Sequence, residues 1–434
     1  MNKIRELFCN DWHFNVFYGL LLLAMVTLPI TNFLMLPIAL LMLINWISEW
    51  NWTEKWHNLR SWQALPALIC FSLVFLSLIP GLVISCNKDE ALAAFDCSTW
   101  LAVAPLVLLT TKPDKMTVKR LRVLLGIFVL STLIHIFIIL SVAFYKFLTT
   151  GKTLYFYYSP LSILKHPSYV AMYCTFSFFI LLEWLRSRFR QISFSSQIIL
   201  MAMMAFLLTA IILLQSKAGL LSLITLVFFW IIYRFCILQR KTAVGIILSI
   251  VVLAAVALIF QSGWIKKNRI QESIEQIQQR KSNPYGTNSS EMRLTLWKCS
   301  WEVAMENMPW GVGTGDATEE LNLHALKMNY TNLIGRHYNA HCQYLQTLME
   351  TGILGLLCLL AFCFYSLAYS IRHKNFLYFS FAIMIIINIA VECMFKVRSG
   401  TNFIALANIL LFIYCSKAKS DHKICEKATD SSSF

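Results

Sequence analysis

The side chains best suited to catalysis lie near position 341, where a polar stretch of the chain runs into a long apolar one. Arg336, His337 and His341 precede the apolar run that begins at Tyr344. Ionisable groups are costly at the start of a membrane helix, so we expect them to serve a purpose there. Histidine titrates near neutral pH, which suits it to moving protons in a reaction. The alternative interpretation is an interfacial histidine on an ordinary packed helix.

Helical spacing extends this interpretation into the apolar run. At about 100° per residue, Gly352 and Gly355 fall on the same side as His341. Glu350 falls on the opposite side. The two glycines would allow a neighbouring helix or loop to approach closely below the histidine.

Four cationic side chains form a second set of candidates. Lys217 lies between two apolar runs with almost no loop between them, and Arg293 begins a predicted helix. Lys396 and Arg398 lie in the turn before the last apolar run. Contact with water, or snorkelling to a membrane interface, explains each of them taken alone. Together, converging cations can balance the charge of a pyrophosphate without a metal ion.

Composition shows which elements must position these groups. Hydrophobic residues make up 58% of the chain and charged residues 14%, whereas a soluble protein is about one quarter charged. The apolar residues come in blocks near the length that crosses about 30 Å of hydrocarbon. We therefore predict an all-α polytopic membrane protein with about twelve spans. The predicted spans are 14–29, 32–47, 64–84, 91–109, 123–145, 167–185, 197–215, 218–233, 243–260, 344–370, 376–394 and 402–415.

The basic residues predict how the chain is oriented in the membrane. With both termini in the cytoplasm, every short inner loop carries at least two Lys or Arg residues, as the positive-inside rule requires. The net charge of +15 is then mainly a topology signal, and its partners are anionic lipid headgroups. No basic-aromatic module is present, so nucleic-acid binding is not expected.

One long segment on the outer side breaks the pattern of short loops. We divide the chain into a bundle of about nine spans (1–260), an outer loop or cap (261–343), three last spans (344–415) and a cytoplasmic tail (416–434). The loop is predicted to be mostly helical. Its first helix contains Ile270, Ile274 and Ile277, and turn formers follow at 281–290. A second helix over 291–307 carries Leu294, Trp297 and Trp301 on one face, and Pro309 ends it.

Several kinds of chemistry find no support in the sequence. Most of the 13 cysteines lie in apolar runs, where cysteine behaves as a small hydrophobic residue. Cys342 follows His341 directly, but adjacent helical residues point about 100° apart, so a Cys–His nucleophile is not expected. No metal-binding spacing and no nucleotide-binding glycine loop occurs, so neither metal nor cofactor is predicted.

Four stretches, taken in order, resemble one known family, the O-antigen ligase and O-antigen polymerase superfamily. Residues 216–219 (Ser-Lys-Ala-Gly) resemble its Ser-Arg-Gly-Ala-type turn. Residues 293–315, from Arg-Leu-Thr-Leu-Trp to Gly-Val-Gly-Thr-Gly, are similar to its Arg…Trp…Pro…Gly-x-Gly-x-Gly run. Residues 340–356 resemble its His-Asn-x-x-Leu…Glu-x-Gly…Gly-Leu pattern, and residues 166–169 (His-Pro-Ser-Tyr) resemble a His-Pro-x-Tyr element.

The resemblance implies a role for each matching residue. His341 maps onto the family histidine, a general base or acceptor-orienting group, and Arg293 maps onto a loop arginine that binds the donor pyrophosphate. Lys217 stands where the family has an arginine, and lysine offers a point charge instead of a fork. The possible supporting residues are His337, Arg336, His166, Tyr169, Lys396 and Arg398.

The implied activity is a metal-independent glycosyl transfer on the periplasmic face of a bacterial inner membrane. The donor would be a glycan on undecaprenyl pyrophosphate. In a ligase the acceptor is a hydroxyl of lipid A-core, whereas a polymerase extends the lipid-linked glycan and a protein O-oligosaccharyltransferase modifies a protein. A polysaccharide transporter or flippase is a rival class, which is expected to show repeat symmetry and charges near the midplane. A receptor or structural membrane protein is the remaining one.

Overall fold

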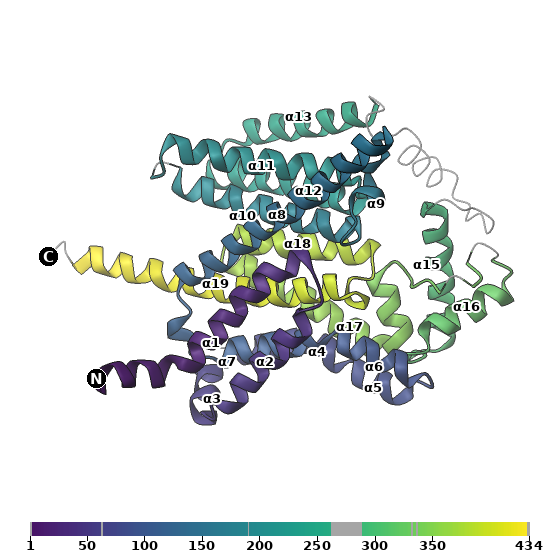
Figure 1. The fold of residues 1–434 in the computed structure, drawn as a ribbon, viewed down its shortest axis with the longest axis horizontal. Coiled ribbons are helices and arrows are strands. Elements are labelled where there is room, and N and C mark those ends of the chain that lie inside the picture. The colour runs from purple at the N-terminus through teal and green to yellow at the C-terminus, as the bar shows by residue number, and fades with distance from the viewer. Residues whose placement is uncertain are drawn as a thin grey trace.

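The computed structural model is a bundle built from helices (Figure 1). It describes residues 2–61, 64–189, 191–261, 289–330, 333–335 and 337–431, and no strand occurs within these ranges. The all-α prediction is therefore confirmed for this part of the chain. The helices are α1 (Asn2–Ile30), α2 (Met35–Ser48), α3 (Trp52–Ser61), α4 (Ala64–Leu76), α5 (Leu78–Ile84), α6 (Lys88–Cys97), α7 (Thr99–Thr110), α8 (Val118–Thr150), α9 (Tyr158–Leu161), α10 (Pro167–Arg188), α11 (Phe194–Leu214), α12 (Lys217–Ile231), α13 (Thr242–Gln261), α15 (Ser289–Glu306), α16 (Ala317–Lys327), α17 (Gln343–Arg372), α18 (Phe376–Val391) and α19 (Arg398–Ser431).

The predicted spans correspond to these helices. Among the described residues, nine helical segments are long and apolar enough to cross a membrane. Three shorter apolar helical segments, Met35–Ser48, Thr242–Val251 and Phe376–Val391, coincide with the other predicted spans. The number of twelve crossings therefore stays a prediction.

Helices α10 and α19 form the centre of the bundle. In their apolar windows, 78% and 89% of the residues are buried, more than in any other candidate span. The ring of Phe403 in α19 lies 5.5 Å from that of Phe128 in α8 and 5.0 Å from that of Tyr173 in α10. Aromatic packing of this kind fixes how α8, α10 and α19 sit together, and with them the helix ends that carry the candidate residues.

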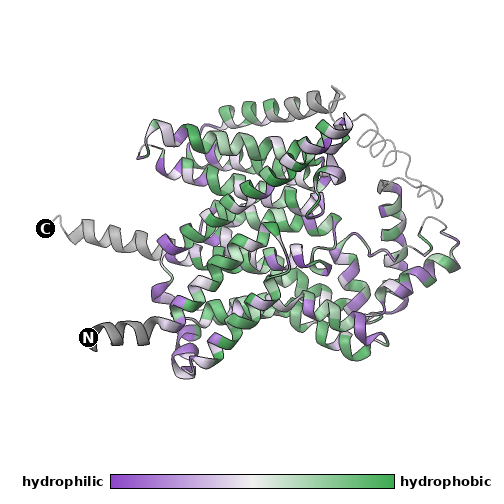
Figure 2. Ribbon diagram, viewed as in Figure 1, coloured by the Kyte–Doolittle hydropathy of each residue, from purple (hydrophilic) through white to green (hydrophobic). Residues whose placement is uncertain are grey.

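Helices α15 and α16 form a polar cap on one end of the bundle, while α1 begins and α19 ends at the opposite end (Figure 1). Figure 2 shows hydrophilic residues gathered on α15 and α16 and at the opposite end, with hydrophobic helices between them. The second predicted loop helix, 291–307, is confirmed as α15. The first, around Ile270, Ile274 and Ile277, lies outside the described residues, as does most of the turn at 281–290.

The face that α15 buries is not the one with the tryptophans. Leu296, Cys299 and Val303 are buried against α16 and the start of α17, whereas Trp301 is 51% exposed. Leu294, Trp297 and Trp301 share one face of α15 by their spacing, as predicted, but this is not the face that packs against α16. The smaller side chains form the packed stripe instead, because they allow α16 to approach closely.

A break at Gly352 divides α17 into two helical pieces. Gly352 has φ of 63° and ψ of −155°, a backbone conformation that side chains other than glycine rarely adopt. The break lets the loop after α15 enter: the amide of Val312 donates to the Met349 carbonyl at 2.8 Å, and that of Gly313 donates to the Glu350 carbonyl at 3.0 Å. The expected close approach of a helix or loop at this glycine is therefore confirmed, and the approaching segment is a loop.

Candidate active site

Glu392 holds two of the predicted site residues together. Its carboxylate lies just beyond the end of α18 and is 8% exposed. The imidazole Nδ1 of His341 lies 3.2 Å from Oε2, and the guanidinium of Arg293 pairs with Oε1. The structure thus brings His341 and Arg293, which are far apart in sequence, onto one buried carboxylate.

The charge state of Glu392 follows from these neighbours. Burial raises the pKa of Glu392, but the hydrogen bond to His341 and the positive charge of Arg293 lower it by more, so the pKa lies below its ordinary value. An ionised Glu392 accepts a hydrogen bond from Nδ1–H of His341. The other ring nitrogen, Nε2, is then unprotonated in the neutral tautomer and can accept a proton.

The backbone presents His341 outside the helix that follows it. The helix begins only at Gln343, and His341 has φ of 47°. The amide of His341 donates to Asn339 Oδ1 at 3.0 Å, and Trp297 Nε1 donates to the His341 carbonyl at 3.4 Å. Extrapolating helical spacing back to His341 was therefore wrong, because the chain turns sharply before the helix starts.

Two glutamines tie the start of α17 to the turn that carries Glu392. Gln343 accepts a hydrogen bond from the Phe395 amide at 2.9 Å. Gln346 accepts from the Ala340 amide at 2.8 Å and from the Cys393 thiol at 3.9 Å, and it donates to Glu350 at 2.8 Å. Buried, satisfied amides of this kind keep His341 and Glu392 in register, because moving either segment would leave polar groups unpaired.

The predicted supporting cations Lys396 and Arg398 each pair with a carboxylate of their own. Lys396 Nζ lies 2.6 Å from Glu350 Oε1, and Arg398 pairs with Asp96. Burial lowers the pKa of Lys396, but the charge of Glu350 and its hydrogen bond raise it by more, so the pKa lies above its ordinary value. The alternative that these two cations are merely solvated is wrong for Lys396.

The start of α10 supplies the other side of the site. Ser168 Oγ donates to Glu392 Oε1 at 3.4 Å, and the rings of His166 and Tyr169 lie 6.2 Å apart. Burial lowers the pKa of His166, as do the nearby charges of Arg293 and His341, against the opposing effect of Glu392. Tyr169 is almost fully buried, which assigns it a packing position beside the site.

Lys217 begins α12 next to the start of α10. Ser216 caps this helix by accepting a hydrogen bond from the Gly219 amide at 3.2 Å. A Cβ at Gly219 would lie only 2.5 Å from Cβ of Ala171 in α10, so glycine is needed for the two helix starts to meet. This contact brings Lys217 to the same end of the bundle as His166 and Ser168.

Two predicted residues are not brought into the cluster. His337 is exposed, and its Nδ1 lies 3.3 Å from Asn322 Nδ2 in α16. Arg336 lies outside the described residues. Within the described ranges, no group of three or more His, Cys, Asp or Glu residues is placed to hold a metal ion.

Glu392 is the site residue that sequence reasoning missed. It lies near the end of the predicted span 376–394. The cost of an ionisable group at the end of a membrane helix, which singled out His341, applies equally to this lone carboxylate.

The comparisons with known proteins agree with the resemblance. Residues 202–360 match the family model described as O-antigen ligase. No curated protein matches the chain. The matched segment contains Lys217, Arg293 and His341, whereas Glu392 lies beyond it. The match covers less than half of the chain, and over this segment it supports the resemblance to the O-antigen ligase and polymerase superfamily and to glycan transfer of that type.

Proposed function

We propose that the chain is an O-antigen ligase-like glycosyltransferase that moves a glycan from undecaprenyl pyrophosphate to a hydroxyl of lipid A-core. The observation that carries the proposal is the contact of His341 and Arg293 with the two oxygens of Glu392. One carboxylate thereby links a proton acceptor to a cation, and glycosyl transfer from a pyrophosphate needs both groups.

In the proposed reaction, His341 is the general base. Glu392 fixes the imidazole through Nδ1, and Nε2 accepts the proton of the acceptor hydroxyl. The hydroxyl oxygen forms the new bond to the anomeric carbon of the donor sugar as the bond from that carbon to the pyrophosphate oxygen breaks. The resulting imidazolium is stabilised by the carboxylate of Glu392, which stays ionised.

The leaving pyrophosphate takes the electron pair of the broken bond. Arg293 and Lys217 are the proposed ligands of its charge, because fixed cations stabilise a charge that grows in the transition state. Arg293 offers several donors on a planar guanidinium, so it can contact a phosphate oxygen while it keeps one contact with Glu392. No metal ion is required in this scheme.

The acceptor distinguishes the proposal from its alternatives. An O-antigen polymerase would extend the lipid-linked glycan, and a protein O-oligosaccharyltransferase would modify a protein. In a deletion strain, loss of all long chains with accumulation of lipid-linked polymer indicates a ligase. Retention of a single repeat on lipid A-core indicates a polymerase, and unchanged lipopolysaccharide with an unglycosylated protein indicates the third activity.

The proposed site faces the periplasm, with both termini in the cytoplasm. The basic residues concentrated in the predicted inner loops support this orientation. Single cysteines in a background without native cysteines test it with an impermeant thiol reagent. Sites in 281–290 should label in intact cells and sites in 112–120 should not, and the reverse pattern would refute the periplasmic site.

The sharpest test of the mechanism is Glu392→Gln with a matched control. The amide removes the negative charge that orients His341, so kcat is expected to fall about a hundredfold or more. Glu302→Gln is the control, because Glu302 also contacts a histidine, His324 Nε2 at 2.9 Å, but lies away from Glu392. Equal activity in the two variants at equal membrane levels would refute the role of Glu392.

A further inference from the structure

A pocket of about 640 Å³ lies at the opposite end of the bundle from Glu392. It is formed by the start of α8, the end of α10 and the start of α11. Helix α10 begins beside Glu392 and runs 22 residues to Arg188, which corresponds to about 33 Å. The pocket is therefore separate from the candidate active site.

The charged lining of this pocket has one sign. The described residues that line it include Lys119, Arg122 and Arg188 and no carboxylate. An adjoining pocket adds Ser187 and Gln191, which can donate hydrogen bonds. The acidic residue just before this part of α10 is Glu183, and it already pairs with Arg186. An anion entering the pocket would thus meet cations with no internal competitor among the lining residues.

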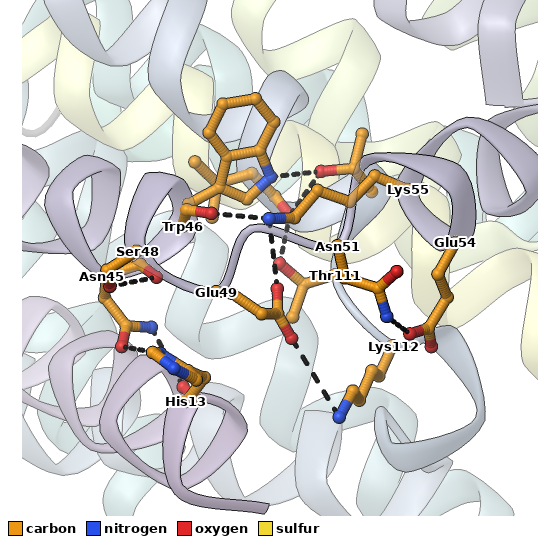
Figure 3. Close-up of polar contacts among 12 residues, drawn as sticks. His13, Asn45, Trp46, Ser48, Glu49, Asn51, Glu54, Lys55, Thr111 and Lys112 are labelled. Carbon is orange, nitrogen blue, oxygen red and sulfur yellow. Dashed lines mark hydrogen bonds and ion pairs between the residues drawn. The ribbon is translucent and has the colours of Figure 1, made fainter. Parts of the chain in front are cut away.

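A second cationic group at the same end of the bundle shows the contrast. Figure 3 shows Lys55 and Lys112 pointing toward one carboxylate, that of Glu49. The Nζ atoms lie 3.3 Å and 4.0 Å from its oxygens, and Lys55 also donates to the Trp46 carbonyl. Here the fold supplies its own counter-ion, as partly buried charges generally require. The pocket with Lys119, Arg122 and Arg188 has no such carboxylate in its lining.

The remaining wall of the pocket is apolar. Val123, Trp184, Ile192 and Leu200 line it together with Gly126. A Cβ at Gly126 would lie 3.1 Å from the Trp184 ring, so the glycine allows the indole to lie against α8. Cations at the helix ends beside apolar side chains on the membrane-spanning segments match a molecule with a charged head and a hydrocarbon tail.

We propose that this pocket binds the phosphate headgroup of an anionic phospholipid. Arg122 and Arg188 contact phosphate oxygens, because guanidinium groups donate in a geometry that phosphate accepts. Lys119 adds a third charge, and the acyl chains lie along Val123 and Leu200. Free phosphate shares the headgroup chemistry but lacks the tail, so it should bind more weakly than the lipid.

The test is retention of phospholipid by the purified full chain, measured by native mass spectrometry. The protein is equilibrated with phosphatidylglycerol, with cardiolipin, with zwitterionic phosphatidylcholine or with inorganic phosphate. Arg122→Gln/Arg188→Gln should bind the anionic lipids about tenfold more weakly or worse, because each basic residue near an anionic lipid contributes roughly a fivefold factor. Phosphatidylcholine binding should not change.

The matched control is Arg372→Gln/Lys374→Gln. It removes two exposed cations at the same end of the bundle, one at the last residue of α17 and one just beyond it, both outside the pocket. The control should keep wild-type lipid retention. Equal losses in the two double variants would show only general attraction to negative lipid and would overturn the proposal. If inorganic phosphate bound as tightly as the anionic lipids, the assignment of the pocket to a phospholipid would be overturned.

Discussion

The candidate active site and the basic pocket at the opposite end of the bundle both carry cations but neutralise them differently. At the end with the candidate active site, Arg293 pairs with Glu392 and Lys396 pairs with Glu350. At the opposite end, Arg122 and Arg188 line a pocket that has no carboxylate in its described lining. An internal carboxylate holds a cation in one geometry before any substrate arrives. A cation without one takes its counter-ion from its surroundings, which at a membrane surface are lipid headgroups.

Two lysines at the end with the candidate active site show how a carboxylate partner affects the pKa of a lysine. Lys396 has Glu350 as its partner, and its pKa is raised despite burial. Lys165 is buried with neutral partners: its Nζ donates to Asn32 Oδ1 at 2.5 Å and to Ser399 Oγ at 3.2 Å. Burial lowers the pKa of Lys165 to about 8. A nearby carboxylate therefore decides whether the pKa of a buried lysine lies above or below its ordinary value.

Removing the proton acceptor should have the largest effect. His341→Ala is expected to abolish transfer, because general-base catalysis alone contributes about 10²–10⁴-fold. His337→Ala should retain activity, since His337 contacts Asn322 and lies outside the cluster. A complementation assay for surface polysaccharide, with membrane levels checked by blot, measures both. Wild-type polysaccharide from His341→Ala would refute the role of His341 as the general base oriented by Glu392. His337 would then be the next candidate.

Breaking an internal ion pair should cost stability in proportion to burial. Lys396→Met leaves Glu350, which is 3% exposed, without its partner and should lower the free energy of unfolding by about 3 kcal/mol. Arg398→Met breaks the more exposed pair with Asp96 and should cost less than about 1 kcal/mol. Unfolding of detergent-solubilised protein measures both.

The double variant Lys396→Met/Glu350→Gln separates the charge from the packing. It removes both charges and should recover most of the stability that Lys396→Met loses. If Lys396→Met and Arg398→Met lower the free energy of unfolding by equally small amounts, the buried carboxylates do not organise the end of the bundle that holds the candidate active site.

Weakening the proposed donor site should mainly affect donor affinity. Arg293→Ala is expected to raise the donor KM about ten- to a hundredfold, because charge-assisted hydrogen bonds contribute roughly 1.5–3 kcal/mol each. Lys217→Arg should be tolerated, whereas Lys217→Ala should not. Steady-state kinetics with lipid-linked glycan provides the measurement. Wild-type values of both kcat and donor KM would contradict pyrophosphate binding by Arg293, whereas a loss in kcat alone would place its contact in the transition state.

Because the partners of Lys165 are neutral, the Tm difference between the wild type and Lys165→Met should change by a few degrees with pH. The pKa of Lys165 is about 8 in the folded protein and near 10.5 when unfolded, so the unfolded chain binds more protons between these values. Its contribution to stability is therefore full above pH 10.5 and is lost as pH falls through 8. The wild type should gain Tm relative to Lys165→Met as pH rises from 8 to 10, whereas Lys327→Met, at an exposed position, should follow the wild type. Parallel curves for the wild type and Lys165→Met would contradict this account.

Removing divalent metals should have no effect at all. The proposed site balances the pyrophosphate charge with Arg293 and Lys217, so activity is expected to persist in EDTA. Purified enzyme assayed with and without the chelator gives the answer. Complete loss that Mg²⁺ or Mn²⁺ restores would mean that these cations do not suffice.

The sequence by itself determined the helical membrane architecture and most of the candidate site. Hydropathy located apolar helices at each predicted span, because a membrane helix depends on the composition of its own segment. The same local reasoning identified α15 and singled out His341, Arg293 and Lys217. It also marked Gly352 as a point of close approach.

Only the tertiary structure decided which of these groups meet. Glu392 lies 51 residues from His341 and 99 residues from Arg293 in sequence. No local pattern records such pairings, since they arise from the packing of α15 and α18 against α17 and of α10 against α18. The break at Gly352 depends likewise on hydrogen bonds from a distant loop. Short-range composition thus fixes which segments become helices, and long-range packing fixes which charge faces which.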